Sequence, residues 1–286
     1  MGAREEVLIT AEELARRLAA DEPLTLLDVR WELGQPDGIK AYERGHLPTA
    51  VYVSLEEELT DHSVAGRGRH PLPSGRAVQA AARRWGVRTG VPVVVYDDWI
   101  RAGSARAWWV LTAAGIADVR ILDGGLPAWT GELSTGSVTP EPGDVTVHHD
   151  DLYAAARRTV TADGAADGSR ILLDVRAPER YRGEGEPVDP VSGHIPGAVN
   201  LPSASMLAGD GAWLAERELT GLFEERGVGA GSDVAVYCGS GITAAITIAA
   251  LATVGVDAAL FPGSWSQWSA DPARPVATGS TPASDQ

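Results

Sequence analysis

Short apolar runs alternate with amphipathic stretches along most of the chain. The runs are TLLDV at 25–29, VVVY at 93–96, VRIL at 119–122, ILLDV at 171–175, VAVY at 234–237 and AALF at 258–261. Each is rich in Val, Leu and Ile and is too short for a helix. Such runs are typical of strands that are buried on both faces of a parallel sheet.

The stretches between these runs have helical signals. Thr10 is followed three residues later by Glu13, which is the spacing of a capping box at a helix start. Three further apolar stretches end at Gly86, Gly115 and Gly255, where glycine is a typical C-terminal cap. Strands and helices in alternation predict an α/β fold with a mostly parallel central sheet flanked by helices.

The pattern occurs twice. LLDVR begins at Leu26 and again at Leu172, and a GHxP motif begins at Gly45 and again at Gly193. VVVYDD and VAVYCG correspond in the same way, as do LDGGLPAW and LFPGSWSQW. The separation of the copies is nearly constant and close to the length of one domain, so the sequence predicts a tandem duplication.

We therefore predict two domains of the same fold. The first covers residues 1–135 and the second covers residues 151–272. Residues 136–150 are rich in Gly, Pro, Ser and Thr and are predicted to be a linker. Residues 273–286 have no apolar periodicity and are predicted to be a disordered tail.

Charge and composition narrow the possible functions. The net charge is −15, from 39 acidic and 24 basic residues, which argues against nucleic acid and anionic membrane surfaces as partners. No apolar run is long enough to span a membrane, and the N-terminal residues do not resemble a signal peptide. One cysteine cannot form an intrachain disulfide, and no His/Cys cluster suggests zinc. These features predict a cytoplasmic protein.

The single cysteine, Cys238, directly follows the predicted strand at 234–237. The loop continues with Gly239, Ser240, Gly241, Ile242 and Thr243, and the next helical stretch begins near Ala244. Ligands of parallel α/β sheets bind at the carboxyl ends of strands. Glycines let backbone N–H groups converge on one point, and the helix N-terminus favours negative charge. The sequence therefore predicts a thiolate held by N–H donors rather than a buried apolar cysteine.

These motifs together resemble the tandem-domain rhodanese family, which comprises thiosulfate and 3-mercaptopyruvate sulfurtransferases. The resemblance extends from about Val7 to Trp268 and includes the paired LLDVR and GHxP motifs, the CGSGITA loop and PGSWSQW. It implies that Cys238 takes sulfur from a donor as a persulfide and passes it to a thiophilic acceptor such as cyanide, a thiol or a thioredoxin-like protein. It also implies a monomer that needs no metal and no organic cofactor.

The first copy has Asp97 where the second has Cys238. A carboxylate cannot carry the transferred sulfur, so the first domain is predicted to be catalytically silent. The loop also excludes a phosphatase of this fold, which needs an Arg after five intervening residues. That position is Ala244.

Residues near the loop suggest which donor is used. Neutral Gly239 and Ser240 resemble the mercaptopyruvate type, in which Ser240 would assist as a catalytic hydroxyl. Arg180 matches the arginine that binds the donor carboxylate in the family. In the mercaptopyruvate enzymes of the family a second arginine often comes soon after the Glu-Pro of this loop, whereas here Glu186-Pro187 is followed by Val188 and Asp189. Arg101, in the first domain, is a candidate replacement.

Two residues of the first domain are weaker candidates for the site. His46 belongs to the first GHxP motif and would approach the donor, and Asp37 lies in a nearby loop. Thr243 is as well suited to capping the following helix as to catalysis. Two alternatives remain open: a thiosulfate:cyanide sulfurtransferase, and a carrier module that holds sulfur as a persulfide.

Overall fold

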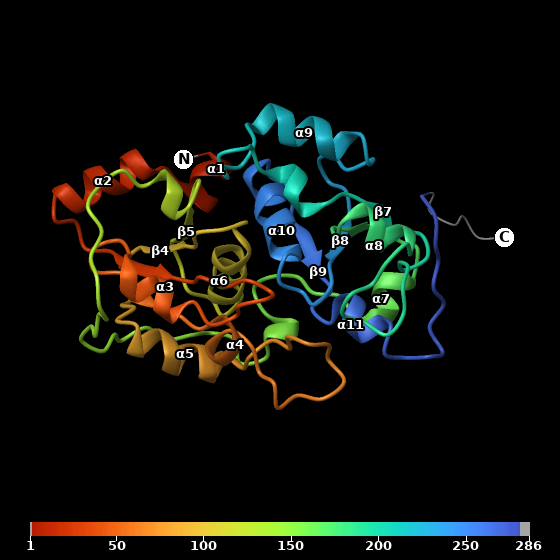
Figure 1. The fold of residues 1–286 in the computed structure, drawn as a ribbon, viewed down its shortest axis with the longest axis horizontal. Helices are drawn as coiled ribbons and strands as arrows, with labels where there is room; N and C mark the ends of the chain where they lie inside the picture. The colour runs from red at the N-terminus through yellow and green to blue at the C-terminus, as the bar shows by residue number, and fades with distance from the viewer. Residues whose placement is uncertain (1, 281–286) are drawn as a thin grey trace. The chain divides into compact units, whose positions relative to one another are not determined.

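The computed structural model describes residues 2–280 and divides them into two compact units (Figure 1). Unit 1 comprises residues up to Asp61, Leu72–Arg157 and Leu207–Trp213. Unit 2 comprises His62–Pro71, Arg158–Met206 and the chain from Leu214 onward. Each unit therefore includes a short segment that lies, in sequence, within the other.

Unit 1 contains a five-stranded sheet in the order β1-β5-β4-β2-β3, and all its strand pairs are parallel. The strands are β1 (Leu8–Ile9), β2 (Thr25–Asp28), β3 (Val51–Tyr52), β4 (Val93–Tyr96) and β5 (Val119–Leu122). The helices are α1 (Ala3–Val7), α2 (Ala11–Ala19), α3 (Ile39–Arg44), α4 (Leu55–Glu58), α5 (Gly75–Arg84) and α6 (Ala102–Ala113), with 3₁₀ turns η1 (Leu126–Ala128) and η2 (Leu152–Ala154).

Unit 2 repeats this order with four strands, β7-β6-β8-β9, which are also parallel. The strands are β6 (Ile171–Asp174), β7 (Val199–Asn200), β8 (Val234–Tyr237) and β9 (Ala258–Leu260). The helices are α7 (Ala162–Ala166), α8 (Pro178–Arg182), α9 (Glu216–Glu224), α10 (Ala244–Thr253) and α11 (Ser264–Trp268), with the 3₁₀ turn η3 (Ser203–Met206). Thr159 forms a parallel bridge to Leu260 at the edge that corresponds to β1 of unit 1.

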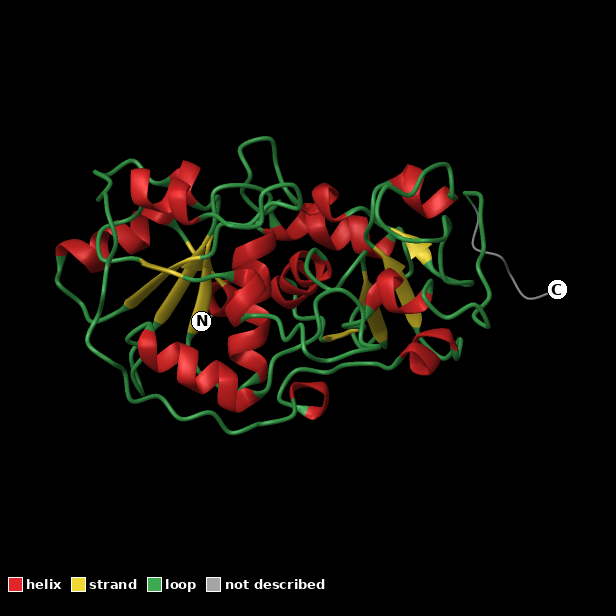
Figure 2. Ribbon diagram, turned by 60° about the horizontal axis from the view of Figure 1, so that its bottom comes forward, coloured by secondary structure: helices red, strands yellow, loops and turns green. Residues whose placement is uncertain are grey.

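The predicted α/β architecture is confirmed in both units. Helices lie on both faces of each sheet (Figure 2), and every apolar run singled out in the sequence contains a strand. Thr10 Oγ1 accepts a hydrogen bond from the N–H of Glu13 at 3.1 Å, which starts α2. Gly86, Gly115 and Gly255 follow helices with positive φ angles, as C-terminal cap glycines do.

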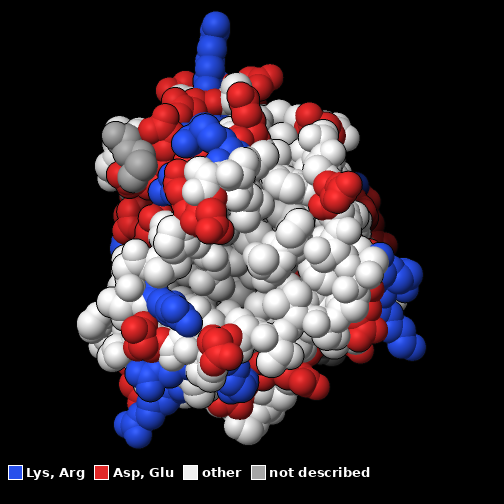
Figure 3. All heavy atoms as spheres, turned by 90° about the vertical axis from the view of Figure 1, so that its left-hand side faces the viewer, with Lys and Arg blue, Asp and Glu red and all other residues white. Residues whose placement is uncertain are grey.

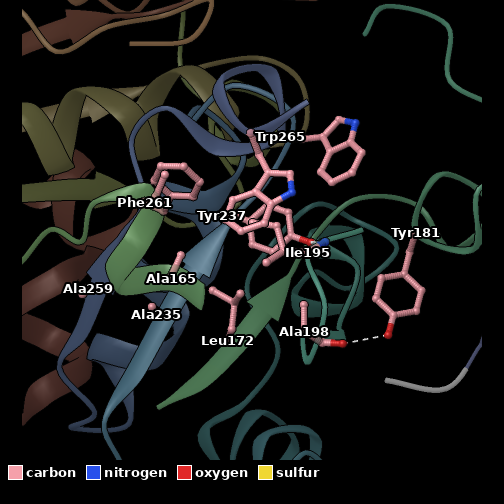
Figure 4. Packing of buried hydrophobic residues seen from close by; sticks show 12 residues of the cluster. Ala165, Leu172, Tyr181, Ile195, Ala198, Ala235, Tyr237, Ala259, Phe261 and Trp265 are labelled. Carbon is pink, nitrogen blue, oxygen red and sulfur yellow. Dashed lines mark hydrogen bonds between the residues drawn. The ribbon is translucent and has the colours of Figure 1, made fainter. Parts of the chain in front are cut away.

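The core of unit 2 lies beside the strand that leads to Cys238. Tyr237, Phe261 and Trp265 pack together with Ala and Leu side chains from neighbouring strands (Figure 4). The hydroxyl of Tyr181 donates to the carbonyl of Ala198 at 2.7 Å, which joins α8 to this core. The apolar packing fixes the end of β8 on which the loop depends.

Part of the predicted tail belongs to the fold. Ala277 and His194 exchange two backbone hydrogen bonds, and Ala277 is buried. Disorder is therefore the wrong expectation for the tail near residue 277, because an edge pairing holds it there. Residues 281–286 of the predicted tail lie outside the described residues.

Two surface properties bear on partners. On the face drawn in Figure 3, acidic and basic side chains surround a central area without charged groups, so this face has no continuous basic patch. Among the described residues, no helix is long and apolar enough to cross a membrane.

Candidate active site

Cys238 is the first residue after β8, and the loop that it begins ends where α10 starts (Figure 1). Its side chain is buried, and the N–H of Gly241 points at the sulfur with an N···Sγ distance of 3.1 Å. Gly241 has φ +82°, a conformation that glycine adopts without strain. The predicted cradle therefore has at least one N–H donor directed at the thiol.

The turn before α11 and its first residues hold the loop from the other side. The backbone N–H of Cys238 donates to Ser264 Oγ at 3.1 Å, and its carbonyl accepts from Trp265 N–H at 3.0 Å. Gly239 O accepts from Ser266 N–H at 2.9 Å. The backbone on both sides of the sulfur is thus tied to a second element, which leaves the loop little freedom.

The remaining loop residues take different positions. Ser240 and Ile242 are buried, and the Ser240 hydroxyl makes no hydrogen bond to any residue that the structure describes. It is the Gly241 N–H, rather than the hydroxyl of Ser240, that contacts the Cys238 sulfur. Thr243 occupies the N-cap position of α10, but its side chain makes no capping hydrogen bond. The capping role considered for Thr243 is therefore limited to its backbone.

Arg180, in the last turn of α8, is held by two buried carboxylates. Its Nε and Nη2 donate to the two carboxylate oxygens of Glu186 at 3.1 and 2.6 Å, and Nη2 lies 3.4 Å from Asp189 Oδ2. Although burial acts to raise the pKa of Glu186, the hydrogen bonds and charge of Arg180 bring it below its usual value. Glu186 is therefore ionised at neutral pH and fixes the plane of the guanidinium.

Arg69 was missed by the sequence analysis. It belongs to the 62–71 segment of unit 2, and its Nη1 forms an ion pair with Asp189. A Cβ placed on Gly239 would lie 3.2 Å from Arg69 Nη2 and 3.5 Å from Arg180 Nη1. Two guanidinium groups thus flank the residue after Cys238. The sequence GRGRHP does not predict the position of Arg69 beside Gly239, because the contact joins residues far apart in sequence.

The corresponding loop of unit 1 is filled by its own side chain. Asp97 follows β4, and its carboxylate accepts from the N–H groups of Trp99, Arg101 and Ser104 and from the Ser104 hydroxyl at 2.7–3.2 Å. The duplication thus places a permanent carboxylate where unit 2 has a thiol.

Arg101 makes its contacts within its own loop of unit 1. Its side chain is buried, lies 3.3 Å from Asp97 Oδ1, and donates to the backbone carbonyls of Asp97 and Trp99. These contacts use the guanidinium within its own loop and do not favour Arg101 as the second cation, which stays a prediction. Arg101 has φ +64°, a left-handed conformation that strains the backbone of a residue other than glycine.

The two weaker candidates have local roles in unit 1. His46 is fully buried, stacks on the ring of Tyr42 at 4.1 Å, and places Nδ1 3.0 Å from the Tyr42 carbonyl oxygen. Asp37 is exposed, and its carboxylate accepts from the N–H of Ile39 and the hydroxyl of Tyr52. His46 Nε2 is buried without a hydrogen-bond partner among the described residues, and both contacts of Asp37 fall on Oδ1, so the roles predicted for these two residues stay predictions.

His194 repeats the arrangement of His46 in unit 2. It stacks on Tyr181 at 3.7 Å, and its Nδ1 lies 2.7 Å from the Tyr181 carbonyl oxygen. Burial lowers its pKa, so the ring is neutral at pH 7. The two GHxP histidines therefore order the turn that contains them.

Fold and loop together define a duplicated α/β protein in which one copy has a buried thiol in an N–H cradle and the other has a carboxylate. The rhodanese-like domain model matches this chain twice, at residues 10–132 and 159–271. The chain therefore belongs to the rhodanese family, and it is a sulfurtransferase.

Named relatives extend over nearly the whole chain. A Mycobacterium tuberculosis protein provisionally named thiosulfate sulfurtransferase SseB is 63% identical over 282 residues, 98% of this chain and 99% of that protein. The 3-mercaptopyruvate sulfurtransferase of Escherichia coli K12 is 33% identical over 278 residues, 94% of this chain and 96% of that protein. The crystal structure of Escherichia coli SseA, a 3-mercaptopyruvate sulfurtransferase, superposes with TM-score 0.79 at 31% identity and covers 91% of this chain and 98% of its own.

Proposed function

We propose that this enzyme moves sulfur from 3-mercaptopyruvate to a thiophilic acceptor through a persulfide on Cys238. The observation that carries the proposal is the geometry of one loop. Gly241 N–H points at the Cys238 sulfur, and the guanidinium of Arg180 lies beside Gly239. A nucleophile and a cation for the donor carboxylate thus meet at adjacent residues.

The proposed reaction has two steps. The Cys238 thiolate attacks the sulfur of mercaptopyruvate, the donor's C–S bond breaks, and its electron pair leaves on the enolate of pyruvate, which then takes up a proton. The acceptor next attacks the outer sulfur of the persulfide. The S–S bond breaks, and its electron pair returns to Cys238. Ser240 is well suited to hydrogen-bond the leaving enolate, since its hydroxyl has no partner among the described residues.

Charge around the loop supports a monoanionic donor. The guanidinium groups of Arg69 and Arg180 are balanced by the carboxylates of Glu186 and Asp189. Mercaptopyruvate brings one negative charge, whereas thiosulfate brings two and gains more from an excess of positive charge. No such excess exists among these four groups.

Thiosulfate is the second candidate donor. The name of the Mycobacterium tuberculosis relative favours it. The same thiol cradle would also suit a persulfide carrier, although a carrier has no need for a carboxylate site. The proposed partners are small sulfur donors and acceptors, with a thioredoxin-like protein as one acceptor for a monomeric enzyme. A single reactive thiol fits the reducing cytoplasm, where we propose that it acts.

Steady-state kinetics distinguish the donors. We expect a higher kcat/KM with mercaptopyruvate than with thiosulfate when cyanide is the acceptor in both assays. Arg180→Ala should raise the KM for mercaptopyruvate roughly 10- to 100-fold, the value of a lost charge-assisted hydrogen bond.

The control is Arg182→Ala, which removes the same charge from α8. Arg182 pairs with the exposed Glu184 at 2.6 Å and should leave KM within twofold. A higher kcat/KM with thiosulfate would overturn the donor, and an unchanged KM in Arg180→Ala would remove Arg180 from the site.

A further inference from the structure

We infer that residues 275–279, in the last part of the described chain, position Arg180 for the donor. The 275–279 segment bonds both to α11, which holds the Cys238 loop, and to α8, which carries Arg180. Figure 1 shows this part of the ribbon leaving α11 and running past α8. The inference rests on the proposed function, because it concerns how the cation of the proposed donor site is kept in place.

The first half of the segment is bonded to α11 and to the GHxP turn. The indole Nε1 of Trp268, the last residue of α11, donates to the carbonyl of Pro275 at 2.9 Å. Ala277 and His194 exchange two backbone hydrogen bonds of 2.8 and 3.0 Å. The segment is therefore fixed before it reaches α8.

The second half packs against the end of α8. The N–H of Gly279 donates to the carbonyl of Arg182, the last residue of α8, at 3.0 Å. Gly183 follows α8 with φ +80°, and a Cβ there would lie 2.9 Å from Cγ2 of Thr278. A helix of 5 residues is too short to be stable without tertiary contacts. The segment thus supplies contacts on which the last turn of α8, and with it Arg180, depends.

At the other end, α11 holds the loop of the nucleophile. The N–H of Trp265 donates to the carbonyl of Cys238 at 3.0 Å. The N–H of Ser266 donates to the carbonyl of Gly239 at 2.9 Å. A Cβ placed on Gly239 would lie 3.5 Å from Nη1 of Arg180. Because the 275–279 segment bonds to both helices, it opposes separation of this guanidinium from the Cys238 loop.

Unit 1 contains a segment of the same construction at residues 132–136. Its hydrogen-bonded pairs are Trp129 with Glu132, Ser134 with His46, and Gly136 with Glu43. In unit 2 the corresponding pairs are Trp268 with Pro275, Ala277 with His194, and Gly279 with Arg182. The segment is therefore part of the duplicated fold, and unit 1 offers a matched control for it.

The two copies differ in what they hold. The residue before the tyrosine that stacks on the GHxP histidine is Ala41 in unit 1 and Arg180 in unit 2. The loop at the end of the neighbouring strand begins with Asp97 in unit 1 and with Cys238 in unit 2. Only the segment of unit 2 can therefore act on donor binding by this route.

A purely structural segment would behave alike in the two units. Its disruption in either unit would lower the free energy of unfolding and leave the KM for the donor unchanged. If the 275–279 segment positions Arg180, its disruption weakens the first half-reaction. Discharge of a preformed persulfide to cyanide should persist, because Trp265 and Trp268 keep α11 packed in the core of unit 2.

The test compares Ala277→Pro with Ser134→Pro in the intact chain. Each substitution removes a backbone N–H that donates to the carbonyl of a GHxP histidine. We expect Ala277→Pro to raise the KM for mercaptopyruvate about 10-fold, the value of one lost hydrogen bond, with discharge to cyanide within about twofold. Ser134→Pro should leave both quantities within about twofold of wild type.

Two further measurements keep the test independent of folding and of the donor. If a proline variant folds poorly, Trp268→Phe and Trp129→Phe take the place of the pair, since they remove only the indole N–H at the start of each segment. Amide hydrogen exchange should become faster in α8 when the 275–279 segment is disrupted, and in α3 when the 132–136 segment is disrupted. Unchanged exchange in α8 would overturn the inference.

The failures of the two proposals differ. If wild-type enzyme turns over thiosulfate and not mercaptopyruvate, the proposed donor is wrong, and the segment is then tested by the KM for thiosulfate. If Ala277→Pro keeps the wild-type KM for the working donor while Arg180→Ala raises it, the inference is overturned and the proposed function stands. Equal changes of KM in Ala277→Pro and Ser134→Pro, or equal slowing of both half-reactions, would also overturn it, because either result indicates a general loss of stability.

Discussion

Gly239 and Gly241 lie on either side of Ser240 and serve the loop in different ways. Gly239 leaves room for the guanidinium groups of Arg69 and Arg180, which a Cβ would meet at 3.2 and 3.5 Å. Gly241 supplies the N–H at the Cys238 sulfur from a left-handed backbone conformation. Glycine is required at position 241 by the backbone conformation, whereas a Cβ at position 239 would crowd the two guanidinium groups.

Gly241→Ala should destabilise the protein. The new Cβ would lie 2.4 Å from the Pro262 carbonyl oxygen, and φ +82° strains any L-residue. We expect the free energy of unfolding to fall by about 1–3 kcal/mol, measured by urea denaturation. Gly229→Ala is the matched control, since nothing lies within 4 Å of its Cβ and its φ is not positive. Equal stability of the two variants would contradict the account of the loop.

At the scale of elements, the strand–loop–helix unit occurs in two versions. In the β4–α6 version the Asp97 carboxylate takes the N–H donors and binds Arg101, whereas in the β8–α10 version a thiol is left for an incoming group. In the first version the side chain of Asp97 therefore occupies the position that an anionic group would take in the loop. This supports the prediction that the first domain is catalytically silent.

The variant Asp97→Ala tests whether the Asp97 carboxylate holds the loop between β4 and α6. It would leave the buried Arg101 guanidinium without its carboxylate, and we expect a loss of about 3–5 kcal/mol in the free energy of unfolding. Asp98→Ala, which removes a partly exposed carboxylate 3.6 Å from Arg30, should cost under about 1 kcal/mol. Comparable effects in thermal or urea unfolding would show that Asp97 does not hold the loop.

Local pattern predicted most of these elements. The buried strands and the helix ends at Thr10, Gly86 and Gly115 follow from apolar runs and capping residues, which depend on near neighbours in sequence. The two-residue strands β1, β3 and β7 carry too little pattern to be recognised. Cys238 and its loop could be identified because nucleophile, glycines and helix start are consecutive.

Contacts between distant segments could not be predicted in this way. Arg69 approaches Gly239 only after the chain folds. The pairing of Arg101 with Asp97 could not be predicted either, because it depends on the left-handed backbone conformation and the burial of Arg101. The stacking of His46 on Tyr42 likewise leaves no pattern in the sequence. The division into domains at residues 135 and 151 stays a prediction.

For the molecule as a whole, each unit contains one buried GHxP histidine. We expect His194, the histidine of unit 2, to make the free energy of unfolding depend on pH. Burial lowers its pKa in the folded protein, so below about pH 6.5 the unfolded chain binds a proton that the folded protein does not. The free energy of unfolding should therefore fall as pH decreases from 7 towards 5.5, by at most about 1.4 kcal/mol per pH unit from this group.

His194→Asn should flatten that slope, because the amide N–H can replace Nδ1–H at the Tyr181 carbonyl and does not titrate. Urea unfolding at several pH values measures it. His148 is exposed, so His148→Asn should retain the wild-type slope. An unchanged slope in His194→Asn would mean that other groups cause the acid sensitivity.

The central claim is that Cys238 carries the transferred sulfur, and intact-protein mass spectrometry tests it directly. The chain has one cysteine, so a gain of one sulfur atom can be assigned without mapping. After incubation with mercaptopyruvate and no acceptor, we expect this gain in wild-type protein, its reversal by cyanide, and no gain in Cys238→Ser. A sulfur gain in Cys238→Ser, or no gain in wild-type protein with either mercaptopyruvate or thiosulfate, would contradict the account.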